Sequence, residues 1–235
     1  METKIFDPMS RESQAIAEVR HNARMLLRDA RLLFVARRWG TSIALSILAC
    51  EEAAKFLMFN YMLGTGLQNS TKVKWHAPKQ EEFSRYLRSC LKVRALDEYF
   101  LEKGETDQRQ RLISGLKFLD RLCALNASGE APNDPELSIV CHEIEKRIRY
   151  DEAYKVAEEA TTGKLDGIKQ RGLYVDVREG AILSPRDLCE SDARIYLRAA
   201  DIVVEVIAPQ KIFGNGPVPL THVQTTLEFA LGDRE

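Results

Sequence analysis

The chain has 235 residues, 45% of them hydrophobic, and its 34 lysines and arginines nearly cancel its 35 aspartates and glutamates. This length and composition suffice for one large domain with a hydrophobic core. The charge balance excludes a strong overall positive field, so any contact with RNA has to come from a local patch.

Two long helices are predicted at the start of the chain. From Ser10 to about Arg38, apolar residues recur at steps of three and four, which is the period of an amphipathic helix. Gly40 permits a turn or kink, and a second helix then runs to about Met62, where Gly64 ends it. We expect the two helices to pair antiparallel as a helical hairpin.

Three further helical patterns follow, at about residues 79–103, 107–126 and 135–161. A polar loop over residues 64–78 precedes them, and Pro78 is well placed at the first position of the next helix. The turn-rich stretch 128–135 separates the second and third of these patterns.

The chain ends with a different kind of pattern. Residues 172–177 alternate between apolar and polar side chains, which favours a strand or an extended segment. Ser184 begins a last helix that reaches about Val206. We therefore expect one all-α domain over residues 1–210, a bundle of about six or seven helices with a small extended insertion near 172–178, and a loop-rich tail over 211–235.

The second predicted helix is too apolar to be exposed, yet it carries Glu51, Glu52 and Lys55. Either acid can reach the lysine, because residues three and four apart are neighbours on a helix. A buried charge needs a partner, so these residues indicate an intrahelical salt bridge or a wider polar network.

This tract carries a family resemblance. With the residues before it, the Glu-Glu-x-x-Lys tract resembles the second helix of HEPN domains. The segment from His76 to Lys79 resembles the His-x-x-Lys of the AbiV family of phage abortive-infection proteins, and residues 169–176 resemble that family's R-x-x-L-Y-V-D segment. Ser184 and the helix after it fit the same pattern, so the resemblance covers roughly residues 10–207.

The resemblance implies a helical HEPN-like bundle and a function in anti-phage defence. Such a protein is expected to arrest translation and growth of an infected bacterial cell in response to a phage-encoded protein. HEPN domains commonly act as dimers, so the resemblance also implies a homodimer built on the first two helices.

HEPN proteins that cut RNA do so without a metal, through an Arg-x4-6-His motif. Its histidine moves the proton of the ribose 2′-hydroxyl and its arginine stabilises the phosphate. None of the four histidines of this chain has an arginine five to seven positions before it. Two functions therefore stay open: a metal-independent endoribonuclease, or a catalytically inactive HEPN module that acts only by binding a protein.

The resemblance brings together a set of candidate site residues: Glu51, Glu52, Lys55, His76, Lys79, Arg171, Tyr174 and Asp176. One reading is an RNA or phosphate site, with His76 as general acid or base and Lys79 beside it. The other is a buried polar network that ties the extended segment to the helical hairpin, for example through Glu52 and Arg171. The near balance of acids and bases favours the network, because a phosphate site usually has a positive excess.

Neither a metal nor a cofactor is expected, since the chain lacks the Glu-x-x-His spacing of di-iron bundles and has no Gly-rich phosphate loop. The end of the first helix carries a run of arginines, which most often means a solvated face and is the place where RNA would bind by charge alone. This run comprises Arg24, Arg28, Arg31, Arg37 and Arg38.

We expect a cytoplasmic protein. The N-terminus lacks the pattern of a signal peptide. The longest apolar run, residues 43–63, is interrupted by charges, which argues against a transmembrane helix. The five cysteines lie far apart and form no C-x-x-C pair, so they are expected to be reduced thiols of the core.

Overall fold

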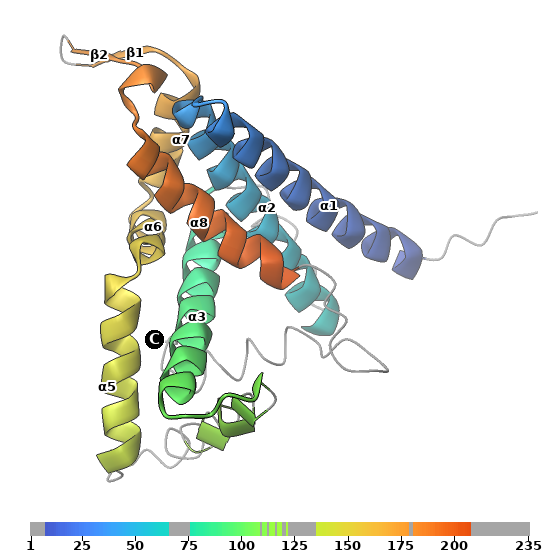
Figure 1. The fold of residues 1–235 in the computed structure, drawn as a ribbon. Helices are drawn as coiled ribbons and strands as arrows, with labels where there is room; N and C mark the ends of the chain where they lie inside the picture. Colours follow the sequence, from blue (N-terminus) through green and yellow to red (C-terminus); the bar gives the residue numbers. More distant parts are fainter. Residues whose placement is uncertain are drawn as a thin grey trace, which may run out of the picture.

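The computed structural model describes residues 8–65, 76–108, 135–178 and 181–207, together with some positions between 110 and 121 that are helical. The helices are α1 (Pro8–Val35), α2 (Trp39–Thr65), α3 (His76–Glu102), α5 (Pro135–Tyr150), α6 (Glu152–Thr161), α7 (Leu165–Leu173), the short 3₁₀ helix η2 (Pro185–Asp187) and α8 (Glu190–Ile207) (Figure 1). The strands are β1 (Asp176–Arg178) and β2 (Ala181–Leu183). The prediction of an all-α bundle with a small extended insertion is confirmed.

Helix α2 lies at the centre of the bundle and packs against α1, α3, α7 and α8. Its apolar residues are distributed all around the helix axis, as expected for a helix covered by several neighbours. Small residues along it, such as Ala44 and Ala53, are fully buried and allow the other helices to approach closely. The predicted antiparallel pairing with α1 is visible in Figure 1.

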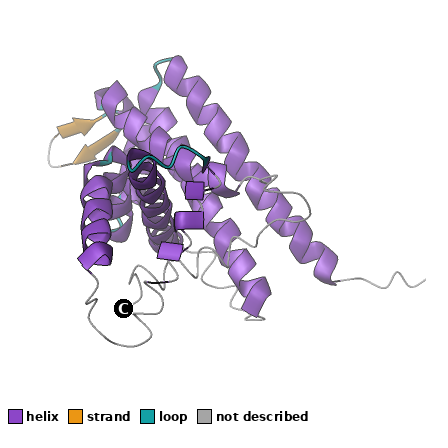
Figure 2. Ribbon diagram, turned by 60° about the horizontal axis from the view of Figure 1, so that its bottom comes forward, coloured by secondary structure: helices purple, strands orange, loops and turns teal. Residues whose placement is uncertain are grey.

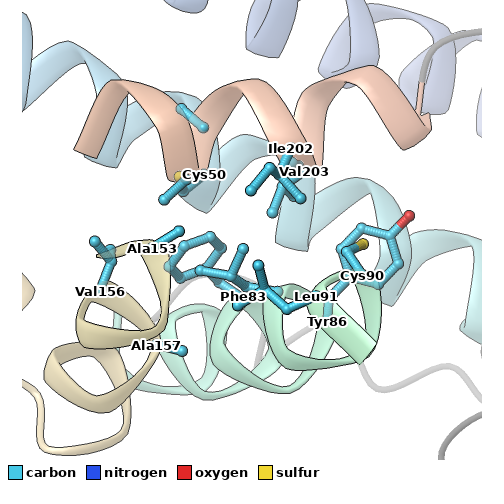
Figure 3. Packing of buried hydrophobic residues seen from close by; sticks show 14 of the residues in the cluster. Cys50, Phe83, Tyr86, Cys90, Leu91, Ala153, Val156, Ala157, Ile202 and Val203 are labelled. Atoms are coloured by element: carbon cyan, nitrogen blue, oxygen red, sulfur yellow. The ribbon is translucent and has the colours of Figure 1, made fainter. Parts of the chain in front are cut away.

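A second part of the core joins α2, α3, α6 and α8. Phe83 of α3 lies between Val156 of α6 and Val203 of α8, with Cys50 of α2 close by (Figure 3). All four side chains are at most 2% exposed. This packing fixes α6 and α3 against the central hairpin.

Strands β1 and β2 form an antiparallel hairpin in which Val177 faces Ile182. The hairpin projects from one end of the helical bundle (Figure 2). The extended insertion therefore exists, but its extended backbone begins at Tyr174 and its first strand at Asp176. Gly172 and Leu173 belong to α7, so the prediction of extended structure from residue 172 is corrected.

Two helix boundaries also differ from the predictions. The turn between α1 and α2 lies at residues 36–38, where Arg37 has a left-handed φ of 58°. Gly40 lies inside α2 and is needed there for a close contact rather than for a turn. The last helix, α8, starts at Glu190, because Ser184 caps the 3₁₀ turn that precedes it.

The predicted helix 135–161 is interrupted at Asp151. This residue has extended backbone angles, and its carboxylate accepts a hydrogen bond from the Ala153 N–H at 2.9 Å, so it caps the start of α6. A cap of this kind satisfies a backbone donor that the first helical turn leaves free. Two shorter helices, α5 and α6, result.

No helix within the described ranges is both long and apolar enough to cross a membrane. The predicted tail over residues 211–235 lies outside the described residues. The single domain over residues 1–210 accordingly stays a prediction.

Candidate functional site

The Glu51 network is a buried polar cluster that joins α2, α3 and α7. The Glu51 carboxylate is 3% exposed and accepts a hydrogen bond from the Lys169 ammonium at 3.0 Å. The Gln80 side-chain amide donates to the same oxygen at 3.3 Å. Each member comes from a different helix, so the cluster ties together three segments that are far apart in sequence.

Lys169 supplies the positive charge that compensates the buried Glu51 carboxylate. Its ammonium also contacts the Asp166 carboxylate, one helical turn earlier, at 2.9 Å. Burial lowers the pKa of Lys169, but the hydrogen bond that its ammonium donates to Asp166 and the charge of Glu51 outweigh it and raise the pKa above its usual value. Lys169 is therefore charged, and it balances two acids.

A contact between two glycines places α7 against α2. A Cβ atom on Gly172 would lie 2.4 Å from the Gly40 carbonyl oxygen and 3.3 Å from the Ala44 Cβ. On the other side, a Cβ atom on Gly40 would lie 2.8 Å from Pro185. Only hydrogen atoms fit at these positions, so α7 and η2 lie directly on the start of α2. Lys169 is one helical turn before Gly172, which directs it toward Glu51.

Glu52 and Lys55 form a separate ion pair on α2, with side chains that are 15% and 24% exposed. This is the i,i+3 pairing that the sequence permits. Neither residue shares a hydrogen bond with the Glu51 network among the described contacts. The charges of α2 are thus divided into two neighbouring pairs.

His76 and Lys79 lie in the first turn of α3. The His76 side chain is outside what the structure describes, so its role stays a prediction. Lys79 is only 7% exposed and, within the described residues, pairs with no carboxylate. Its sequence neighbour Gln80 is the member of α3 that joins the Glu51 network.

The remaining candidate residues lie at the end of α7 and beyond it. Arg171 is half-buried, and its Nε atom has no hydrogen-bond partner in the structure as described. Tyr174 is exposed. Asp176 is the first residue of β1, and its side chain lies outside the described part. None of the described side chains of this segment reaches Glu52.

Lys169 is the site residue that sequence reasoning missed, although it belongs to the 169–176 motif. Asp166 lies three positions before Lys169, and this spacing of an acid and a base is typical of a helix. A helix at this point places Lys169 and Gly172 on one face. The described residues contain no group of three or more histidine, cysteine or acidic side chains able to hold a metal ion.

The family model HEPN_AbiV, described as AbiV, matches residues 13–205. No curated protein matches the chain, and no solved structure does. The matched range contains every helix described above except the first residues of α1 and the last two of α8.

Proposed function

We propose, from the premise that the chain belongs to the AbiV family of HEPN proteins, that it protects bacteria by abortive infection and arrests translation and growth of a phage-infected cell. In this proposal the protein acts in the cytoplasm, responds to a phage-encoded protein, and works by binding its target rather than by cleaving it.

A binding function is supported by the burial and internal pairing of the Glu51 network. Glu51 and Lys169 are 3% and 4% exposed, and each already has its hydrogen-bond partners inside the protein. A general acid or base must come within hydrogen-bond distance of its substrate. These two side chains cannot do so without opening the contact between α2 and α7, which suits a structural role.

Phage challenge tests the defence function. Bacteria that express the full chain from an inducible promoter are infected with a panel of phages, and plaque number, culture survival and incorporation of labelled methionine are measured. We expect fewer plaques, and translation that stops only in infected cells. Normal plaque numbers with every phage of the panel would contradict the proposal.

The second candidate is metal-independent RNA cleavage, and the position of Lys79 in the first turn of α3 favours it. This buried cation is three positions after His76 at the start of α3, an arrangement that suits a phosphate next to an imidazole. Arg24 and Arg28 on the exposed side of α1 pair with no acid among the described residues and could hold an RNA backbone.

Incubation of the pure protein with total RNA, with and without EDTA, separates the two candidates. A binding protein leaves the RNA intact under both conditions. EDTA-resistant cleavage that disappears in a His76→Ala variant of unchanged melting temperature would establish the enzyme instead, since a positioned proton-transfer group contributes roughly a hundredfold or more.

A further inference from the structure

A groove with a volume of about 1200 Å³ lies between α3, α5, the start of α6, α8 and the end of α1. It shares no lining residue with the Glu51 network. Three apolar side chains, Phe34, Leu197 and Ile202, contribute to its lining, and so does Tyr150, which is 81% exposed. The groove therefore combines apolar lining side chains with an accessible aromatic ring.

The lining contains six acidic and five basic side chains, but three of the bases already form ion pairs within the protein. Arg147 pairs with Glu102 at 2.6 Å, and Arg194 pairs with Glu190 at the same distance. Both of these carboxylates lie outside the lining. Arg198 pairs with Asp151 at 2.7 Å.

The acids that remain give the groove a negative excess. Four lining carboxylates have no ion pair within the described residues, whereas only Arg94 and Lys146 remain as unpaired lining cations. The four are Glu98, Glu143, Glu152 and Glu205.

We infer that this groove is a docking surface for a lysine- or arginine-rich segment of a partner protein. The unpaired carboxylates complement basic side chains, and a partner arginine can stack on Tyr150. The partly exposed lining residues Phe34 and Leu197 can contact an apolar side chain between the basic residues. The volume is above the range of about 300–1000 Å³ for small-molecule sites, and the acidic excess repels an RNA backbone.

The chain's own residues 208–235 are a poorer occupant on charge grounds, since they contain Lys211 and Arg234 against Glu228, Asp233 and Glu235. The inference rests on the proposed function and deepens it, because it states the chemistry of the protein partner.

Fluorescence anisotropy with the full chain tests the inference. The probe is a short fluorescein-labelled peptide of alternating lysine and leucine, and the comparison peptide has glutamate in place of lysine. We expect the basic peptide alone to bind, and more weakly as salt is added. The double variant Glu98→Gln/Glu205→Gln should weaken binding about fivefold, from two partly exposed charge pairs.

A matched control is Glu81→Gln/Glu158→Gln, which removes two exposed glutamates outside the groove and should leave the affinity unchanged. Equal losses in both double variants would overturn the inference, as would binding of the acidic peptide. Competition by a synthetic peptide of residues 208–235 would make the chain itself the occupant and would also overturn it.

The two proposals fail in different experiments. If the groove variant protects bacteria against phage as well as the wild type does, the groove is not the partner site and the defence function stands. If the wild type gives no protection, the defence function fails whatever the peptide measurements show.

Discussion

At the residue scale, the pairing of Glu51 with Lys169 gives the sharpest prediction. Lys169→Met removes the cation and leaves a carboxylate that is 3% exposed without its charge partner. Breaking a buried ion pair from one side costs about 3–5 kcal/mol. For a chain of this length we expect the melting temperature to fall by about 10 °C, measured by circular dichroism.

Lys164→Met is the control, because Lys164 is exposed just before α7 and its side chain makes no capping hydrogen bond. Its effect should stay within about 0.5 kcal/mol. The double variant Glu51→Met/Lys169→Met should recover most of the lost stability, since replacing both partners removes the buried charge. Equal effects of the two single lysine variants would contradict a structural role of the network.

Asp151 predicts a dependence of stability on pH. Burial raises its pKa, but the hydrogen bonds from Arg198 and the Ala153 N–H, with the charge of Arg198, outweigh it and hold the pKa below its usual value. A carboxyl group with a lowered pKa stabilises the fold above its unfolded pKa of about 3.9, and the contribution disappears as the pH falls through the folded value.

Asp151→Asn keeps a capping side chain but removes the charge, so we expect a loss of about 1–2 kcal/mol at pH 7 in urea unfolding. The difference from the wild type should shrink below about pH 4. Asp29→Asn is the control, since Asp29 is exposed on α1 and has no described hydrogen bond or ion pair. A difference that does not vary with pH would refute the assignment.

At the element scale, the contact between α7 and α2 predicts opposite effects for two glycines of one helix. Gly172→Ala places a Cβ 2.4 Å from the Gly40 carbonyl oxygen, whereas a Cβ on Gly167 meets nothing within 4 Å. We expect Gly172→Ala to cost about 1–3 kcal/mol through overpacking. Gly167→Ala should stabilise by about 0.5–1 kcal/mol, because alanine is the better helix former.

Chemical unfolding of both variants gives the comparison. Stabilisation by both substitutions would mean that α7 does not lie directly on α2 in solution, and the placement of Lys169 would fail with it.

The same elements explain which boundaries could be read from the sequence. The long periodic patterns of α1, α2 and α3 were predicted nearly correctly, because periodicity accumulates over many residues. Helix α7 was missed, since it has only nine residues and two glycines. The break at Asp151 was missed as well, because the capping conformation of a single aspartate is hidden inside an otherwise continuous helical pattern.

At the scale of the whole molecule, the structure restricts where the interface of the predicted homodimer can lie. Helix α2 is covered by four helices of its own chain, so an interface on the hairpin would have to use α1. Leu32 and Val35 are exposed there at 59% and 80%. We expect light scattering to give twice the chain mass of 26.7 kDa for the wild type.

The variant Leu32→Glu/Val35→Glu should be a monomer in the same measurement, because it places charges in the apolar contact. Ile139→Glu, which changes an exposed apolar residue of α5, should remain dimeric. A monomeric wild type at micromolar concentration would rule out this dimer.

The sequence by itself determined the helical class, the central hairpin and the need of Glu51 for a partner, because periodicity and the cost of buried charge are local properties of the chain. Only the tertiary structure decided that this partner is Lys169, 118 positions away. Both Lys169 and Arg171 near the end of α7 could have met Glu51, and the choice depended on the contact between Gly40 and Gly172. Such a close approach follows from how whole helices pack, which neither residue specifies alone.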